Sequence, residues 1–240
     1  MNKAKELLGK KSKVIWDIDG TLLPTLEIWP TIDDAFIRHM GKVPCENLNN
    51  ISQQGLVEAK GEPNYYAAHK EYIMRAYGID GVTGEEALEI VMNLANESMR
   101  NVGYKPFAAN VIKTLRQDRI SQSIVTNTND DCVDIYKNQN ERIRAAANWN
   151  EFFVPNIITS NHVSEPKPSS EGILMMLDRF PQIKKSGVVL IDDSLEGIRA
   201  GLNAGIDVIS ITEPHWGSEV QEEIRALTPY NIDCFSELVH

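Results

Sequence analysis

Two aspartates stand two positions apart at the end of a short apolar run, in the stretch VIWDIDGTLLPT (14–25). Neighbouring carboxylates repel one another, and each loses hydration when it is buried. Asp17 and Asp19 therefore need a compensating positive charge, and a bound dication would supply it because carboxylate oxygens are ligands that Mg²⁺ prefers. One aspartate could then attack phosphorus to form an aspartyl-phosphate, while the other serves as general acid and base.

Three later segments carry polar residues that suit the same chemistry. Thr126 and Asn127 follow the apolar run SQSIV, Lys167 stands in SEPKPSS, and the pair Asp192 and Asp193 ends GVVLIDD. A lysine can balance excess negative charge and pair with a phosphate, and a threonine hydroxyl can donate to a phosphoryl oxygen. The acidic pair adds oxygen ligands for a hard cation such as Mg²⁺.

The elements that must position these groups alternate between strand and helix. Short apolar strands are predicted in VIWD, SQSIVTNTN, PNIITS, GVVLIDD and DVISIT, with helical periodicity in 107–120, 130–149, 168–180 and 194–205. This pattern predicts an α/β fold, a doubly wound (Rossmann-like) parallel sheet covered on both faces. Ligands of such sheets bind outside the carboxyl ends of the strands, so the polar segments are expected at one edge.

Residues 26–102 form a block of helical pattern with no convincing strand. Helices are predicted at 30–40, 51–60, 65–77 and 85–100, with glycines and prolines between them. We therefore predict an α/β catalytic core of residues 1–25 and 103–240, with an all-helical cap of residues 26–102 inserted after the first strand. An inserted lobe beside strand ends can cover a site.

The strings DIDGT, IVTNT, EPKPS and LIDDSLEGIRAGLNAG resemble, in this order, the four motifs of the haloacid dehalogenase superfamily of phosphohydrolases. The resemblance runs from about residue 13 to 212. It implies that Asp17 is the nucleophile and Asp19 the general acid and base, and that Thr126 and Lys167 hold the phosphate. It also implies a helical cap that closes over a small phosphorylated substrate.

The same resemblance implies a Mg²⁺ site made by Asp17, Asp19, Asp192 and Asp193, with Asp193 as the firmer ligand of the acidic pair. Further substrate-binding residues carried over from the motifs are Gly20 and Thr21, through their main-chain N–H groups, and Asn127. In the cap, Gly55 resembles the glycine of the family's cap loop, and Lys60, His69, Lys70 and Arg75 are possible substrate contacts.

Several other activities fit the same pattern. A phosphomutase would share the first half-reaction, and a phosphonate hydrolase would need a cap lysine, for which Lys60 is the weak candidate. A dehalogenase is disfavoured because its chemistry does not need Asp19. Outside enzymes, a phospho-accepting signalling receiver gathers similar residues in a different order, and a non-catalytic scaffold would be expected to lack a reacting group.

Composition limits the partners of this protein. A formal net charge of −10 argues against general nucleic-acid binding, and no apolar stretch reaches membrane-spanning length.

Three widely spaced cysteines predict reduced thiols and a cytoplasmic location. We expect a monomer or a dimer. Trp29, Trp149 and Trp216 are predicted to be packing residues, and the scattered histidines to be surface or core residues.

Overall fold

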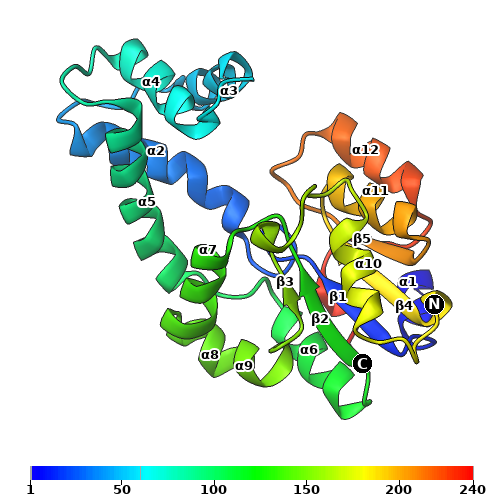
Figure 1. The fold of residues 1–240 in the computed structure, drawn as a ribbon. Helices are drawn as coiled ribbons and strands as arrows, with labels where there is room; N and C mark the ends of the chain where they lie inside the picture. The colour runs from blue at the N-terminus through cyan, green and yellow to red at the C-terminus, as the bar shows by residue number, and fades with distance from the viewer. Residues whose placement is uncertain (1, 60, 240) are drawn as a thin grey trace. The chain divides into compact units, whose positions relative to one another are not determined.

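The computed structural model describes residues 2–59 and 61–239 (Figure 1). The chain forms two compact units, one of residues 1–26 and 100–240 and the other of residues 27–99. These bounds lie close to the predicted division into core and cap. Across the described residues, no helix combines the length and the apolar character that crossing a lipid bilayer requires.

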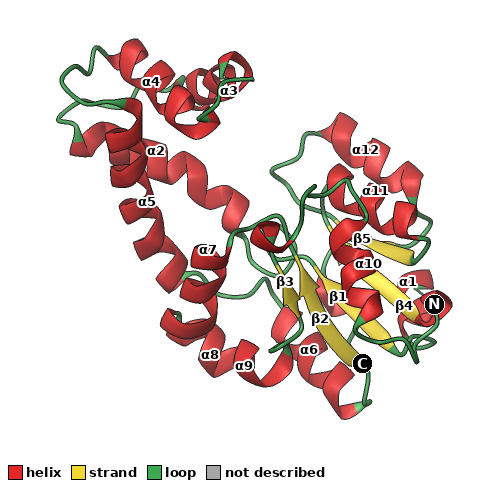
Figure 2. Ribbon diagram, in the orientation of Figure 1, coloured by secondary structure: helices red, strands yellow, loops and turns green. Residues whose placement is uncertain are grey.

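The larger unit is built on one sheet of six parallel strands in the order β3-β2-β1-β4-β5-β6 (Figure 2). The strands are β1 (Lys13–Trp16), β2 (Ser121–Val125), β3 (Ile157–Ile158), β4 (Val188–Asp192), β5 (Asp207–Ile211) and β6 (Asn231–Ile232). The strand order runs outward from β1 to β3, returns to the far side of β1 with β4, and continues to β6. The predicted doubly wound parallel sheet is thus confirmed, with its switch point between β1 and β4, where such folds bind ligands.

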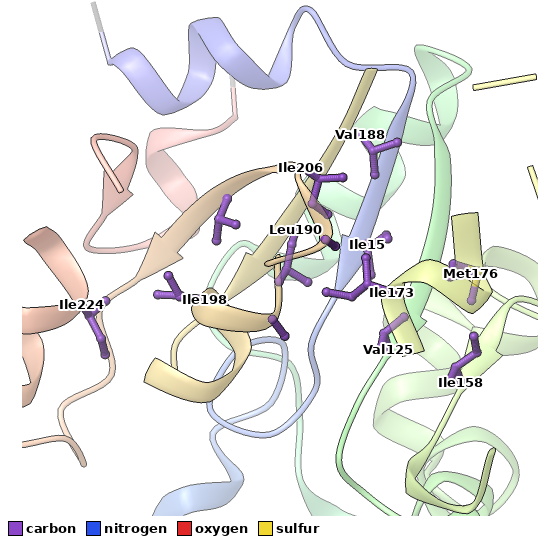
Figure 3. Close-up of a cluster of buried hydrophobic side chains, with 13 residues drawn as sticks. Ile15, Val125, Ile158, Ile173, Met176, Val188, Leu190, Ile198, Ile206 and Ile224 are labelled. Carbon is purple, nitrogen blue, oxygen red and sulfur yellow. The ribbon is translucent and has the colours of Figure 1, made fainter. Parts of the chain in front are cut away.

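Helices cover both faces of the sheet. They are α1 (Lys3–Leu8), α6 (Ala108–Gln117), α7 (Asp130–Asp134), α8 (Glu141–Ala147), α9 (Trp149–Phe152), α10 (Glu171–Asp178), α11 (Leu195–Ala204) and α12 (Ser218–Leu227). On one face, Ile15 and Leu190 of the central strands pack with Ile173 of α10 and Ile198 of α11 (Figure 3). On the other face, Gln122 of β2 donates to a main-chain carbonyl of α6. Burial on both faces explains the apolar runs of β1 after Lys13 and of β4 before Asp192.

The segment 130–149 is helical as predicted but is divided into several elements. α7 gives way to a π-helical turn at Ile135–Gln139, and Asn140 is extended before α8 begins. The Asn140 side chain accepts from the Ile143 N–H at 2.9 Å and donates to the Val102 carbonyl at 2.7 Å. Asn140 thus interrupts the helix because it caps the next one and ties it to the main chain of another segment.

The smaller unit contains α2 (Ile28–His39), α3 (Leu48–Glu58), α4 (Tyr65–Tyr77) and most of α5 (Gly84–Asn101), so its helical content is as predicted. Pro30 lies within the first turn of α2, where a missing N–H costs nothing. The core of this unit holds a buried polar cluster: Lys70 Nζ lies 2.7 Å from Asp33, whose other oxygen accepts from Ser52 at 2.6 Å. The His69 ring lies 3.2 Å from the same serine hydroxyl.

Candidate active site

Three carboxylates meet where β1 and β4 end. Trp16 of β1 pairs with Ile191 of β4, and the next N–H along, that of Asp17, donates to the Ile191 carbonyl at 3.1 Å. This register sets Asp17 beside Asp192, and Asp193 follows directly. Oxygens of Asp17, Asp192 and Asp193 lie within 4.8 Å of one another, and all three residues are buried. The sequence prediction that these carboxylates share one edge of the sheet thus agrees with the geometry.

Lys167 lies between two of these carboxylates. Its Nζ is 2.6 Å from Oδ1 of Asp17 and 2.8 Å from Oδ2 of Asp192. The lysine belongs to the segment before α10, and Asn127 fixes its main chain: the Asn127 amide accepts from the Lys167 N–H at 2.9 Å and donates to the Lys167 carbonyl at 3.2 Å. Asn127 therefore positions Lys167, a role that its place after a strand did not reveal.

Asp192 is held from both sides. Its Oδ1 accepts from the main-chain N–H of Ser194 at 2.9 Å and from the Ser194 hydroxyl at 2.8 Å, while Lys167 contacts Oδ2. Gly197 in the first turn of α11 allows this arrangement, since a Cβ there would overlap the Asp192 carboxylate. The carboxylate consequently has a fixed orientation at the start of the helix.

The electrostatics of the site favour a cation. Burial raises the pKa of Asp17 well above its usual range; Lys167 opposes the shift, and the charges of Asp192 and Asp193 add to it. Burial, followed by repulsion from Asp192, raises the pKa of Asp193 to about 7. Burial disfavours the charged form of Lys167, but Asp17 and Asp192 outweigh it, so that the pKa of this lysine rises. Three carboxylates and one lysine leave excess negative charge in a buried, oxygen-rich site, which fits a hard dication.

The Asp19 side chain lies among hydroxyl groups instead. Its Oδ1 accepts from Thr25 at 2.6 Å and from Tyr136 at 3.3 Å, and its Oδ2 accepts from Thr128. The group of three clustered carboxylates does not include it. The part of Asp19 as a metal ligand therefore stays a prediction, whereas its separate hydroxyl environment suits a role in proton transfer.

Gly20 and Thr21 serve the site differently from what the motif implied. The Gly20 N–H donates to the Leu23 carbonyl at 2.9 Å, and the Thr21 N–H to the Ile18 carbonyl at 3.2 Å, so the turn itself uses both donors. Gly20 has a φ of +82°, and a Cβ there would lie 2.8 Å from Cγ of Asp193. The Thr21 hydroxyl donates to Oδ1 of Asp193 at 2.6 Å. Both residues thus position Asp193.

Two other main-chain donors in the same segment remain unengaged. Within the described part of the chain, the N–H groups of Ile18 and Asp19 have no hydrogen-bond acceptor. They belong to the two residues that directly follow Asp17 in the sequence. The Thr126 hydroxyl, predicted to hold phosphate, donates to the Thr128 hydroxyl at 3.0 Å and accepts from the Thr128 N–H at 3.1 Å. Thr128 thereby connects Thr126 to Asp19.

Among the described residues, those predicted for the cap do not form a comparable site. The family resemblance placed Gly55 in a cap loop, but it lies inside α3, where a Cβ would be 2.8 Å from the His69 ring. This glycine thus allows close packing of α3 on α4. Lys70 and His69 are buried in the polar core of the unit. Lys60 lies outside the described residues.

The packing role predicted for Trp216 is incomplete. Its indole N–H donates to Oδ2 of Asp193 at 2.7 Å. Tyr136 and Thr25 were also missed, since nothing in their local sequence indicates a bond to Asp19. Only Trp216 offered a signal, because a tryptophan shortly after a strand end in this fold lies near the ligand edge.

Comparison with known proteins agrees with this geometry. The model of the haloacid dehalogenase-like hydrolase family matches residues 14–211, which is most of the chain. The chain belongs to this family. The resemblance of the four motifs is therefore confirmed, as is the expectation of a hydrolase.

Two relatives of this haloacid dehalogenase-like hydrolase are described as phosphatases. A "Probable pseudouridine-5'-phosphatase" of Drosophila melanogaster is 23% identical over 90% of this chain and 88% of the relative. A phosphoglycolate phosphatase of Pseudomonas fluorescens is 21% identical over 91% of this chain and 76% of the relative. Among solved structures, the "putative HAD-hydrolase" YfnB of Bacillus subtilis, bound to magnesium, has a TM-score of 0.73 at 20% identity, covering 95% of this chain and 96% of YfnB.

Proposed function

We propose that this hydrolase is a Mg²⁺-dependent phosphatase that removes the phosphoryl group from a small phosphorylated metabolite through an aspartyl-phosphate. The observation that carries the proposal is the Asp17 carboxylate, buried beside Asp192 and Asp193 and contacted by Lys167 at 2.6 Å. The Asp17 carboxylate is paired with the Lys167 ammonium and adjoins two further carboxylates that could hold a metal ion. Membership of the family and the described activities of the two relatives support the same class of reaction.

The first half-reaction transfers the phosphoryl group to Asp17. One Asp17 oxygen attacks phosphorus, so that a P–O bond forms to Asp17 while the bond to the substrate oxygen breaks. Asp19 gives its proton to that departing oxygen, and the alcohol leaves neutral. Lys167 and the N–H groups of Ile18 and Asp19 offset the charge on the phosphoryl oxygens.

The second half-reaction releases phosphate. Asp19, now ionised, accepts a proton from a water molecule as that water attacks phosphorus. The bond between phosphorus and Asp17 breaks, which restores the Asp17 carboxylate and leaves Asp19 protonated for the next cycle. The hydroxyls of Thr25 and Thr128 both donate hydrogen bonds to Asp19 and keep its carboxylate in one place for these two proton transfers.

The residues present fit a magnesium ion. Asp17 and Asp193, with Asp192 beside them, would hold it, and the bound ion would neutralise the carboxylates and polarise the phosphoryl oxygens. Asp192 already accepts three hydrogen bonds, so Asp193 and Asp17 offer the freer lone pairs. We assign Thr126 and Asn127 to the phosphate-facing edge, where Asn127 also holds Lys167.

Asp17→Asn tests the nucleophile, with 4-nitrophenyl phosphate as substrate. The amide keeps the shape of the side chain but cannot attack phosphorus, so turnover should fall at least about a thousand-fold, as for other catalytic nucleophiles. Asp118→Asn, an exposed aspartate at the end of α6, is the matched control and should retain wild-type turnover. Full turnover by Asp17→Asn would show that another residue is the nucleophile.

A substrate screen separates the related activities. Sugar phosphates, nucleotides and short-chain acid phosphates should release inorganic phosphate in the presence of Mg²⁺ and lose this release with EDTA. Conversion of a sugar phosphate to its isomer without net phosphate release would replace hydrolysis by a mutase reaction. Borohydride trapping of a carbonyl-bearing phosphonate on a lysine would indicate a phosphonate hydrolase.

A further inference from the structure

Asp193 differs from the other two clustered carboxylates in how its charge is compensated. Lys167 contacts Asp17 and Asp192, and the ion pairs of the described residues give Asp193 no cationic partner. Two neutral donors hold it instead: the Thr21 hydroxyl at Oδ1, 2.6 Å away, and the Trp216 indole N–H at Oδ2, 2.7 Å away. Each donor occupies one lone pair of one oxygen, which fixes the carboxylate plane and leaves other lone pairs for a cation.

Trp216 is well suited to this task. An indole N–H can only donate, so its bond to Asp193 has one polarity. The tryptophan lies in the loop between β5 and α12, and its partly buried side chain packs against the core cluster, which includes residues of α11 and β5. The His215 ring contacts it edge-on, with ring centroids 5.2 Å apart. The ring is therefore held by packing at the distance that the hydrogen bond needs.

A buried ion pair anchors the same loop. Glu213 is 1% exposed, and its carboxylate pairs with Lys105, whose main-chain N–H donates to the Leu22 carbonyl at 2.9 Å. The Glu213 carbonyl accepts from the Trp216 N–H at 3.1 Å and from the Gln221 side chain at 2.6 Å. Glu213 thus joins the segment after the first motif to the loop that carries Trp216.

We propose that Trp216 is a positioning residue for cation binding. It orients the Asp193 carboxylate, and the buried Glu213–Lys105 pair holds the loop so that Trp216 stays within hydrogen-bonding distance of Asp193. The proposal rests on the proposed function, because it assigns the partner that tunes the same metal site. Outer-shell partners of this kind typically change metal affinity by about 10- to 100-fold when they are removed. No motif of the sequence contains Trp216, and the loop that carries it follows the last of them.

The experiment measures Mg²⁺ binding directly, by calorimetry on EDTA-stripped protein with Mg²⁺ alone. Trp216→Phe keeps an aromatic ring and removes the donor, so its Kd for Mg²⁺ should rise by about 10-fold or more. Glu219→Gln, at an exposed position of α12 outside this network, is the control, and its Kd should stay close to that of wild type. Glu213→Gln, which frees the loop, should also weaken binding. A wild-type Kd in Trp216→Phe would overturn the proposal.

A second measurement needs no variant and guards against a Trp216→Phe chain that fails to fold. In wild-type protein, the indole N–H resonance of Trp216 can be assigned by its correlation to the main-chain resonances of the same residue. This resonance should shift on titration with Mg²⁺, and the Kd from the titration should match the Kd from calorimetry. An unmoved resonance at saturating Mg²⁺ would overturn the proposal. Wild-type phosphatase activity, assayed in parallel, tests the proposed function separately. If the protein turns over substrate but the indole resonance does not shift, only the role of Trp216 is contradicted.

Discussion

The phenolic oxygen of Tyr136 lies 3.3 Å from Oδ1 of Asp19, although 117 positions separate the two residues in the chain. Tyr136 is 1% exposed and comes from the π-helical turn that interrupts the helix after β2. Such turns are often found at functional sites. Its ring packs on Trp149, with centroids 5.7 Å apart, so the hydroxyl reaches Asp19 from a rigid apolar support.

Tyr136→Phe should therefore impair proton transfer more than phosphoryl transfer. A hydrogen bond to a charged group contributes about 1.5–3 kcal/mol, so its loss should reduce turnover of an alkyl phosphate about tenfold or more. Turnover of 4-nitrophenyl phosphate should change less, because that leaving group needs little protonation. Steady-state kinetics with both substrates makes the comparison. Tyr230→Phe serves as control, and equal losses with both substrates would rule out this role of Tyr136.

Gly20→Ala should weaken Mg²⁺ binding as well as the fold. At a φ of +82° an alanine costs about 1–2 kcal/mol in backbone strain, and its Cβ would also press on the Asp193 carboxylate. Gly41→Ala is the matched control, since Gly41 has a φ of +72° and open space around its Cβ position. Urea unfolding and calorimetry should show a stability loss in both variants but weaker Mg²⁺ binding only in Gly20→Ala. Equal Mg²⁺ affinities would contradict the geometry.

Mg²⁺ should stabilise the wild-type protein by binding to the cluster of Asp17, Asp192 and Asp193. A ligand at 100 times its Kd adds about 2.7 kcal/mol to the free energy of unfolding, which a thermal melt detects as a higher Tm. Asp193→Asn removes a charged ligand, so its Tm should respond little to Mg²⁺. In EDTA the variant should melt at or above the wild-type temperature, because one repelling buried charge is gone. The same Mg²⁺-induced rise in both proteins would remove Asp193 from the site.

Lys13 gives a separate prediction on pH, at the opposite end of β1. Burial, with the charge of Arg179, lowers the pKa of Lys13 to about 7, and its Nζ lies 3.5 Å from the centre of the Phe180 ring. The unfolded chain keeps this proton up to a pKa of about 10.4. Between these values the unfolded state binds more protons, so the contribution of Lys13 to stability rises with pH from about 7 to about 10.

Lys13→Met removes this dependence. At about pH 7 the variant should be more stable than wild type, and the difference should shrink as the pH approaches 10. Urea unfolding of both proteins across this pH range measures it, with Lys113→Met on the exposed face of α6 as the control for charge alone. A difference that does not change with pH would mean that Lys13 keeps its ordinary pKa.

The sequence was sufficient where local pattern and topology act together. Strands buried on both faces are continuously apolar, and parallel strands end at one edge, so the meeting of Asp17, Asp192 and Lys167 could be predicted. The break at Asn140 could not, because the bond that stabilises it reaches Val102 in another segment. The motif also implied that the main-chain N–H groups of Gly20 and Thr21 bind the substrate, but these groups form hydrogen bonds within the turn.

The residues around the reacting groups were harder to foresee. Tyr136 reaches Asp19 through tertiary packing, and no pattern in its local sequence indicates this contact. For Trp216, which contacts Asp193, the one signal was its place shortly after a strand end. The helix α12 and the strand β6 were not predicted either; β6 has only two residues. The family resemblance assigned Gly55 to a cap loop, yet Gly55 lies inside α3, as the predicted helix over 51–60 implies, and packs closely on the His69 ring.

The central claim, capture of the phosphoryl group by Asp17, is tested most directly in Asp19→Asn. With 4-nitrophenyl phosphate the first step needs little acid assistance, whereas release of phosphate lacks its base, so the intermediate should accumulate. Acid quenching and peptide mass spectrometry should then find one phosphoryl group on the peptide that contains Asp17. A phosphoryl group on another residue, or release of nitrophenol in burst amounts without any phosphorylated peptide, would contradict the account.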